Sequence, residues 1–365
     1  MPYLRGIYGP LNERALTTYQ KSGIDAVFTY LEGNVKDKEK VKCARERGLK
    51  VYASTWTFGA PTKRAIFGVE NIYGVKSLWN ETGCPNNCVV RENNLAWVRN
   101  VLENLEINGL ILDGVRFPSL GSGLQSFSSC FCQHCREKAE NLGYDLSFIK
   151  GRLKTLGFQD LLRLTSSYSD ASSNLSADRR LQDWLEFRRQ SINEHVGNVR
   201  NMAKVIDQRI EVGAAIFAPT LAPLVGQNYG DLGQILDFLQ PMMYHKGDGI
   251  ACINYELAKL VEGFFTDGKK QAEALKSLYK LFGWDGLNLP LNPQILVKEG
   301  LSPSLMEEEV RRAERLVGEN VNKITPLFFI HNLALTEVKT LMEAAEKQKK
   351  RGIAYFAYFK GFGED

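Results

Sequence analysis

The sequence of 365 residues is 44% hydrophobic and 24% charged, and its 46 Lys and Arg against 42 Asp and Glu leave a formal net charge of +4. This composition is ordinary for a globular protein that buries a large core, and the small, dispersed charge excludes the clustered basic face of a nucleic-acid-binding protein. No run reaches the ~18 consecutive apolar residues of a membrane span, and the first residues lack the pattern of a signal peptide. We therefore expect a cytoplasmic protein without membrane or nucleic-acid partners.

Short apolar segments alternate with longer amphipathic ones along the chain, which is typical of βα repeats around a parallel sheet. We expect strands at residues 4–8, 25–31, 50–58, 109–113, 211–217, 238–244, 324–330 and 352–358. We expect helices at residues 11–21, 36–47, 95–105, 181–206, 254–265, 306–317 and 336–349. Gly23, Gly48 and Gly352 follow the first, second and last of these helices, where glycine commonly ends a helix.

Eight strands that alternate with helices predict an α/β fold, a (β/α)8 TIM barrel formed by residues 1–365 as one domain. The alternative, an open doubly wound sheet, usually has a glycine-rich loop after its first strand, and residues 9–13 lack one. Two connections are unusually long, residues 59–94 after the third strand and 119–180 after the fourth. Both leave the carboxyl ends of strands, so we expect them over the face where barrel enzymes build active sites. A polar tract at 166–178 is predicted to be an exposed loop.

Five of the seven cysteines lie in these two long segments: Cys84 and Cys88 in the first, and Cys130, Cys132 and Cys135 in the second. Three thiols spaced Cys-x-Cys-x-x-Cys can bind one ion but need a fourth ligand for a closed tetrahedral site. Either cysteine of the first segment could supply it. In a cytosolic protein this grouping favours a metal, while disulfides and free thiols stay open. We expect a structural zinc that pins the two segments together, and no organic cofactor.

The fourth predicted strand ends in Gly-Leu-Ile-Leu-Asp-Gly-Val-Arg-Phe-Pro, residues 109–118. Asp113 closes the strand, and Arg116 follows where its guanidinium could reach the same cavity. A carboxylate at the mouth of an apolar barrel is costly unless it is paired, and a guanidinium beside it would keep it ionised and oriented. We therefore interpret Asp113 as a nucleophile, a base or an acceptor for a sugar hydroxyl. An Asp–Arg pair that only holds the loop is the alternative.

Other strand ends bring aromatic and polar side chains to the same mouth. We expect substrate to contact Tyr8, Trp56, Arg116, Tyr244, His245, Asp248 and His331. Aromatic faces stack on pyranose rings while polar groups bind hydroxyls, so this set is typical of a sugar site. Most glycosidases use two carboxylates, and we assign Asp113 as nucleophile or base. Glu32, beside the apolar Leu31 at the end of the second strand, is the expected proton donor, and Asp248 is its competitor.

The chain resembles the glycoside-hydrolase-like barrel proteins of the glycoside hydrolase superfamily. The resemblance is carried by residues 113–118, 130–136, 184–188, 225–229 and 237–244. The cysteine run is similar to that of family 42 β-galactosidases, where it binds a structural zinc with one upstream cysteine; this implies Cys84 as the fourth ligand and leaves Cys88 spare. The chain has Asp113 and His331 where that family has its catalytic glutamates, so those catalytic residues cannot be carried over.

We therefore expect a glycoside hydrolase that acts on an oligosaccharide or glycoside, with a carbohydrate as its partner. The alternative is a catalytically silent barrel that binds a carbohydrate or polyol. A metal-dependent hydrolase would need histidine-rich strand ends, and the four histidines of the chain are all far apart in the sequence. The sugar, its linkage and the stereochemical course stay open. So does the oligomeric state, for which a homo-oligomer is one option.

Overall fold

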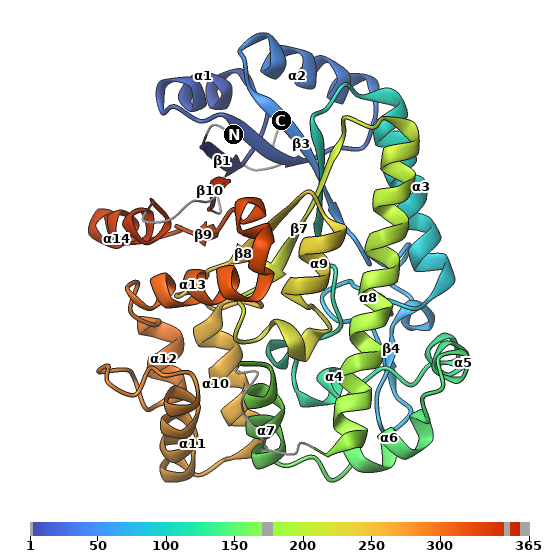
Figure 1. Cartoon of the computed structure of the whole chain (residues 1–365), viewed down its shortest axis with the longest axis vertical. Coiled ribbons are helices and arrows are strands. Elements are labelled where there is room, and N and C mark those ends of the chain that lie inside the picture. Colours follow the sequence, from blue (N-terminus) through green and yellow to red (C-terminus); the bar gives the residue numbers. More distant parts are fainter. Residues whose placement is uncertain (1–2, 170–177, 347–350, 358–365) are drawn as a thin grey trace.

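The protein is described by a computed structural model that covers residues 3–169, 178–346 and 351–357. Eight parallel strands close into a barrel in the spatial order β1-β2-β3-β6-β7-β8-β9-β10. They are β1 (Leu4–Tyr8), β2 (Ala26–Tyr30), β3 (Lys50–Trp56), β6 (Gly109–Asp113), β7 (Glu211–Phe217), β8 (Phe238–Met242), β9 (Leu327–Phe329) and β10 (Gly352–Phe356). The predicted (β/α)8 barrel is confirmed (Figure 1).

The strand bounds follow the local sequence. Three strands, β1, β6 and β7, have the predicted bounds. The strand predicted at 324–330 is shorter because Pro326 has no N–H to donate to the ladder, and Ile324 keeps only an isolated bridge to Leu239. Residue 358, at the predicted end of the last strand, lies outside the described residues.

All seven predicted helices are present. They are α1 (Glu13–Lys21), α2 (Val35–Glu46), α3 (Cys88–Asn104), α8 (Arg179–Ile206), α10 (Ile253–Phe264), α13 (Leu305–Val317) and α14 (Leu335–Glu346). Asn12, Asn34 and Asn87 cap the first three, because each side-chain oxygen accepts an N–H of the first turn. The Asn87 cap starts α3 well before the predicted residue 95. Residue 349, the predicted end of the last helix, is outside the described part of the chain.

Further elements fill the connections. The segment after β3 holds η1 (Ala65–Phe67) and an antiparallel hairpin of β4 (Val69–Glu70) and β5 (Lys76–Ser77). The segment after β6 holds η2 (Leu120–Ser122), α4 (Leu124–Phe127), α5 (Gln133–Asn141), α6 (Leu146–Leu153) and α7 (Phe158–Ser169). The later connections add η3 (Ala222–Val225), α9 (Tyr229–Ile235), α11 (Gly268–Leu281), α12 (Pro293–Glu299) and η4 (Gly318–Lys323).

The prediction of an exposed loop at 166–178 is wrong at its start, because α7 continues through Ser169. Thr165, just before this tract, bonds its hydroxyl within the helix, to the carbonyl of Leu161, and so does not end it. Residues 170–177 lie outside the described residues.

Three aromatic rings fill the barrel toward the amino ends of its strands. The ring centroids of Phe28 and Tyr52 lie 5.0 Å apart, and those of Tyr52 and Phe238 lie 5.5 Å apart. Glycines on neighbouring strands make room for them: a Cβ would lie 2.4 Å from the Phe238 ring at Gly213, and 2.5 Å from the Phe28 ring at Gly6. This packing closes the barrel from below, so the side chains at the carboxyl ends of the strands form its mouth.

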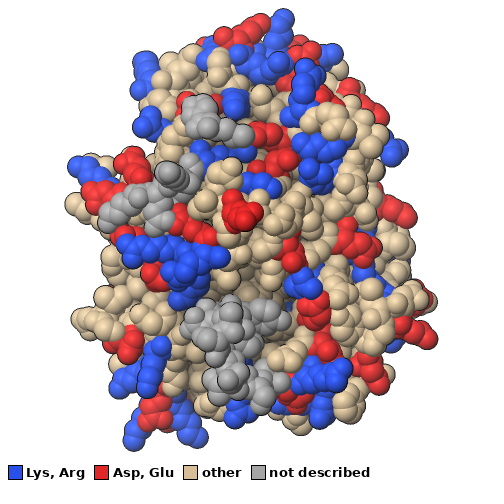
Figure 2. All heavy atoms as spheres, in the orientation of Figure 1, with Lys and Arg blue, Asp and Glu red and all other residues tan. Residues whose placement is uncertain are grey.

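The long helix α8 runs beside α3, and the helices α4–α7 and α10–α12 gather at the end of the molecule opposite α1 and α2 (Figure 1). Acidic and basic side chains are interspersed over the face shown in Figure 2. Among the described helices, none combines the length and apolarity needed to cross a bilayer.

Candidate functional site

Asp113 lies at the mouth of the barrel as the last residue of β6. Its Oδ1 accepts the N–H of Gly114 at 2.7 Å. Gly114 has φ +65°, and a Cβ there would lie 3.2 Å from the Trp56 ring, so a glycine is needed for this turn. Burial raises the pKa of Asp113, and the Gly114 amide and the positive charge of Arg116 offset only part of that effect. The site thus holds a desolvated carboxyl group with one backbone donor.

Arg116 does not form the ion pair with Asp113 that the sequence suggested: among the described residues, no ion pair joins the two. The Arg116 guanidinium lies between the rings of Trp79 and Phe217, 4.4 and 4.7 Å from their centroids, and donates to the Phe117 carbonyl at 3.1 Å. Because the chain turns at Gly114, the Arg116 side chain points toward Trp79 in the segment after β3. Burial lowers the pKa of Arg116 to about 10.

Glu256 of α10 is the carboxylate that most strongly opposes this lowering of the Arg116 pKa. Its buried side chain accepts the Ser119 hydroxyl at 2.8 Å and the N–H groups of Gly121 and Ala251 at 2.6 and 3.1 Å. Burial raises the pKa of Glu256. These contacts tie the loop after β6 to α10, so Glu256 supports the loop that follows Asp113.

Tyr8 and Gln240 meet across the barrel below Asp113. The Tyr8 hydroxyl donates to Gln240 Oε1 at 2.6 Å, and Asp113 is close enough to raise the pKa of Tyr8 beyond the larger effect of burial. Gln240 is fully buried, and its Nε2 has no hydrogen-bond partner among the described residues. An unsatisfied buried amide is costly, so Gln240 is held at an energetic cost while its oxygen fixes the Tyr8 hydroxyl.

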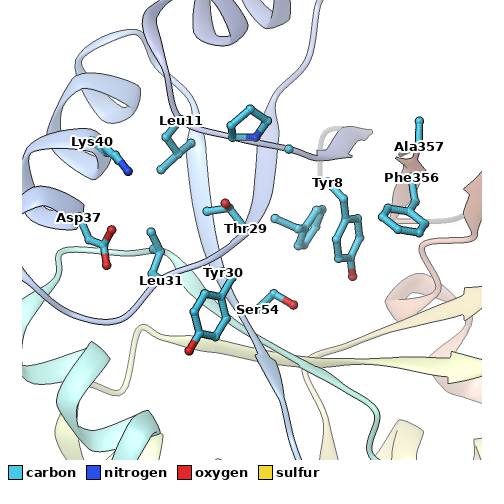
Figure 3. Close-up of a pocket in the computed structure, with 13 residues that line it drawn as sticks. Tyr8, Leu11, Thr29, Tyr30, Leu31, Asp37, Lys40, Ser54, Phe356 and Ala357 are labelled. Carbon is cyan, nitrogen blue, oxygen red and sulfur yellow. The ribbon is translucent and has the colours of Figure 1, made fainter. Parts of the chain in front are cut away.

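A pocket of about 610 Å³ opens at the mouth between β1, β2, β3 and β10. Figure 3 shows the rings of Tyr8 and Phe356 beside one another on one side and Tyr30 along another. The Tyr30 side chain is 62% exposed, yet its ring stacks on that of Trp97. The Asp37 carboxylate also lines the pocket but accepts backbone N–H groups of the β2–α2 turn. The pocket therefore offers aromatic faces rather than free carboxylates.

Glu32 lies on the outer side of this turn. Its side chain is exposed and accepts from Asn34 Nδ2 at 3.2 Å, while its backbone N–H donates to Asp37 at 2.7 Å and its carbonyl accepts from Asn100 at 2.7 Å. In the described part of the chain, no interaction joins Glu32 to Asp113. Glu32 is exposed and outside the pocket lining, and its pairing with Asp113 stays a prediction.

Three more of the predicted contact residues pack near the carboxyl ends of their strands but are not among those that line the pocket. Trp56 donates through Nε1 to the Thr82 hydroxyl at 2.7 Å. The ring of the buried Tyr244 lies 5.5 Å from that of Phe329, and the His331 ring stacks 6.0 Å from the same phenylalanine. Trp56 thus holds the segment after β3 in place through Thr82. The rings of Tyr244 and His331 both pack against Phe329.

Two other predicted residues face away from the pocket or into packing. His245 is fully buried, and its Nε2 lies 3.7 Å from Glu337 Oε1. Burial lowers the pKa of His245 to about 4. Asp248 is exposed in the loop after β8, near Cys252. Neither side chain is among those that line the pocket.

The four cysteines Cys84, Cys130, Cys132 and Cys135 form a second site, with all their sulfurs within 4.8 Å of one another. The Sγ of Cys84 lies 3.4 Å from that of Cys135 and 3.5 Å from that of Cys132. A tetrahedron with zinc–sulfur bonds of ~2.3 Å would have edges of about 3.8 Å. All four thiols are buried, whereas Cys88 is exposed at the start of α3. The cluster can hold a metal ion, and Cys84 is its fourth member.

Backbone and side-chain donors surround these sulfurs. The N–H of Glu70 donates to Cys130 Sγ at 3.3 Å, and that of Asn86 donates to Cys84 Sγ at 3.4 Å. Asn86 also directs its Nδ2 at Cys135 Sγ, at 3.4 Å. Such donors stabilise negative charge on sulfur and orient ligands, so the site is built for thiolates.

Several residues of the site were missed by the sequence analysis, namely Gln240, Tyr30, Phe356 and Glu256. Gln240 had a signal, because it is the single polar side chain in the buried strand Phe-Leu-Gln-Pro-Met. Tyr30 and Phe356 had only their positions at the ends of strands, which many core aromatics share. Glu256 is polar on an otherwise apolar helix face, a pattern that also fits an exposed residue.

No protein-family model matches the sequence, and no curated protein does. Solved structures match in fold. The chain is similar to the glycoside hydrolase domain of PgaB (BpsB) from Bordetella bronchiseptica, with a TM-score of 0.57 and 12% identity over 97% of this chain and 92% of that chain. It is also similar to a polyextremophilic β-galactosidase from the Antarctic haloarchaeon Halorubrum lacusprofundi, with a TM-score of 0.56 and 14% identity over 97% of this chain and 52% of that chain.

The chain thus spans about half the length of the β-galactosidase. The expected resemblance to glycoside hydrolase barrels is confirmed at the level of the fold. At these identities the likeness does not extend to individual catalytic residues, so the chemistry has to be argued from the mouth itself.

Proposed function

We propose that this protein is a glycoside hydrolase that acts on an oligosaccharide or glycoside at the mouth of its barrel, with Asp113 as the proton donor. The observation that carries the proposal is the partly exposed Asp113 side chain at the end of β6, whose carboxyl pKa is raised mainly by desolvation. A glycosidase acid must hold its proton until the leaving oxygen takes it. This assignment differs from the nucleophile or base that the sequence suggested, because Arg116 does not pair with Asp113.

The substrate would bind in the adjacent pocket. Tyr8, Tyr30 and Phe356, which line this pocket, would stack on sugar rings. The fully buried Gln240 would hold the Tyr8 hydroxyl in place from behind the pocket. Trp56 would contact substrate above Gly114. The buried side chains of Arg116, Tyr244 and His245 would support the mouth, and Asp248 and His331 remain candidates for its rim.

Glu32 remains the candidate for the second carboxylate, as nucleophile or base. It directly follows Leu31, and both Leu31 and Asp37 of the β2–α2 turn line the pocket. A Glu32→Gln variant tests this assignment independently of Asp113: it should lose turnover on substrates that Asp113→Asn also fails to cleave, while still binding them.

A silent, carbohydrate-binding barrel is the second candidate, and one observation favours it: Glu32, the candidate second carboxylate, is exposed and is not among the residues that line the pocket. The decisive experiment measures hydrolysis of a panel of aryl glycosides by the wild-type protein and by Asp113→Asn, together with binding of the reactive sugar by calorimetry. Turnover should fall by roughly 10²- to 10⁴-fold, with binding little changed. Asp285→Asn, at an exposed position, is the matched control.

Equal turnover by wild type and Asp113→Asn would exclude Asp113 as the proton donor. Sugar binding without turnover of any glycoside in the panel by the wild-type protein would favour the silent barrel instead.

We further propose that the cysteine site binds zinc in a structural capacity. Four thiolates complete a tetrahedral zinc shell and leave no open position for substrate. The bound ion would join the segment after β3, which carries Cys84, to the segment after β6, which carries the other three cysteines. The ion would hold the two segments beside the mouth rigidly together.

A further inference from the structure

Cationic side chains surround the cysteine site although none of them is a ligand. Arg91 donates to Asn86, which in turn donates to Cys135 Sγ, and Lys138 lies three residues after Cys135 on α5, almost one turn along the helix. The side chains of Arg91 and Lys138 are mostly buried, with 13% and 16% of their surface exposed. The two cations share one carboxylate, Glu194, so a second negative centre beside them would stabilise their burial.

Arg188, on α8, is a third cation at this site and is completely buried. Its guanidinium donates to the carbonyls of Ser129 at 2.5 Å and Leu224 at 2.8 Å. Among the described residues, no carboxylate forms an ion pair with it, and Ser129, whose carbonyl it contacts, directly precedes Cys130. Carbonyl oxygens and the Trp184 ring, 3.8 Å from the guanidinium carbon, stabilise this charge in part, and a nearby anion would add to that stabilisation.

The carboxylates near the site do not cancel these three cations. Glu194 is shared by Arg91, at 2.9 Å, and Lys138, so it accounts for one negative charge. The Glu70 N–H donates to Cys130 Sγ, while the Glu70 carboxylate lies 3.4 Å from the Arg136 guanidinium and 3.9 Å from the Lys150 ammonium. The cysteine cluster therefore sits in surroundings with an excess of at least two positive charges.

We propose that Arg91, Lys138 and Arg188 form a cationic shell that stabilises a divalent metal ion held by the four thiolates. The inference rests on the proposed metal site. Four thiolates and a divalent ion carry a net charge of −2, which is expensive to bury without compensation. The excess positive charge of the shell, about +2, would balance it.

Arg91 also positions a sulfur donor. Its Nη2 donates to Asn86 Oδ1 at 3.0 Å and to the Ser191 carbonyl at 2.8 Å, and Asn86 in turn donates to Cys135 Sγ. The positively charged Arg91 therefore holds Asn86 so that the positive end of the Asn86 amide dipole faces Cys135 Sγ. Partners of this kind typically change metal affinity by 10- to 100-fold.

The test changes the charge of the shell in both directions. Lys138→Gln removes a positive charge and Glu194→Gln removes a negative one, and both side chains are partly exposed, at 16% and 48%. Zinc affinity is measured by competition with a chromogenic chelator on the full-length protein, and zinc release is timed after adding excess chelator. Lys138→Gln should weaken zinc binding about tenfold, and Glu194→Gln should strengthen it. Arg189→Gln is the control: Arg189 lies on α8 with Glu194 but pairs with Glu186, so this variant should leave the zinc affinity unchanged.

The outcomes separate the two proposals. A wild-type protein that binds no stoichiometric zinc overturns the metal site itself. Stoichiometric zinc in wild type, with Lys138→Gln and Glu194→Gln shifted in the same direction or not at all, overturns only the cationic shell. A general loss of packing would weaken zinc binding in both variants, so the opposite signs are specific to the electrostatic explanation.

Discussion

The indole of Trp97 stacks on the phenol ring of Tyr30, with ring centroids 6.3 Å apart and ring planes inclined by 20°. Trp97 is itself held by a hydrogen bond from its Nε1 to the Leu31 carbonyl at 2.9 Å. The pair keeps an exposed aromatic face in a fixed orientation at the edge of the pocket. A fixed ring loses little entropy when a sugar stacks on it.

Tyr30→Ala should therefore weaken sugar binding at the mouth by roughly tenfold, because an aromatic stacking contact contributes about 1 kcal/mol beyond its buried area. The stability of the fold should change little, since Tyr30 is largely exposed. Binding is measured by calorimetry with the sugar found in the hydrolysis panel. Tyr73→Ala, at an exposed tyrosine outside the pocket, is the control, and equal losses in both variants would contradict the assignment.

The pH dependence of turnover should report Asp113. A proton donor is active only while protonated, so kcat should fall as pH rises through the pKa of Asp113, which burial raises above that of an ordinary aspartate. The positive charge of Arg116 lowers this pKa. Arg116→Met should therefore shift the alkaline limb of the kcat profile to higher pH. A limb that stays in place in a folded Arg116→Met protein would be inconsistent with Asp113 as the acid.

The two cysteines of the first long segment should behave differently on substitution. Cys84→Ser should reduce bound zinc from about one ion per chain to nearly none, because a closed site needs four ligands, and should lower the thermal midpoint. Cys88→Ser should retain zinc, since Cys88 is exposed at the start of α3. Metal content by mass spectrometry and thermal unfolding check both. Zinc loss in Cys88→Ser alone would reverse the ligand assignment.

Acid should destabilise the protein through His245. Its folded-state pKa is about 4, lowered mainly by burial, although Glu337 raises it and Lys246 lowers it further. The unfolded histidine, with a pKa near 6.5, binds a proton more readily in this range. The free energy of unfolding should thus decrease as pH falls from about 6.5 to 4, by about 3 kcal/mol from this residue. Denaturant titrations should show a flatter pH dependence for His245→Gln, and an unchanged slope would rule out this contribution.

The barrel was predictable because its signals are local. Apolar strands alternate with amphipathic helices because different faces of each element are buried. That pattern can be read from each segment by itself. The bounds of β1, β6 and β7 agree with the prediction for this reason. The position of Asp113 at a strand end and the spacing of the three clustered cysteines are equally local, so both are evident in the linear sequence.

The tertiary structure decided which of these groups meet. Tyr8 and Gln240 are separated by 232 residues, and their hydrogen bond exists only because the barrel closes. Whether Cys84 or Cys88 joins the other cysteines depended on the cap that starts α3. Arg116 was expected beside Asp113, but the left-handed turn at Gly114 and the rings of Trp79 and Phe217 hold it elsewhere. Side-chain direction and desolvation depend on neighbours brought together from distant segments, so the sequence determined the fold and the residues at the mouth, while folding determined their partners and their charge.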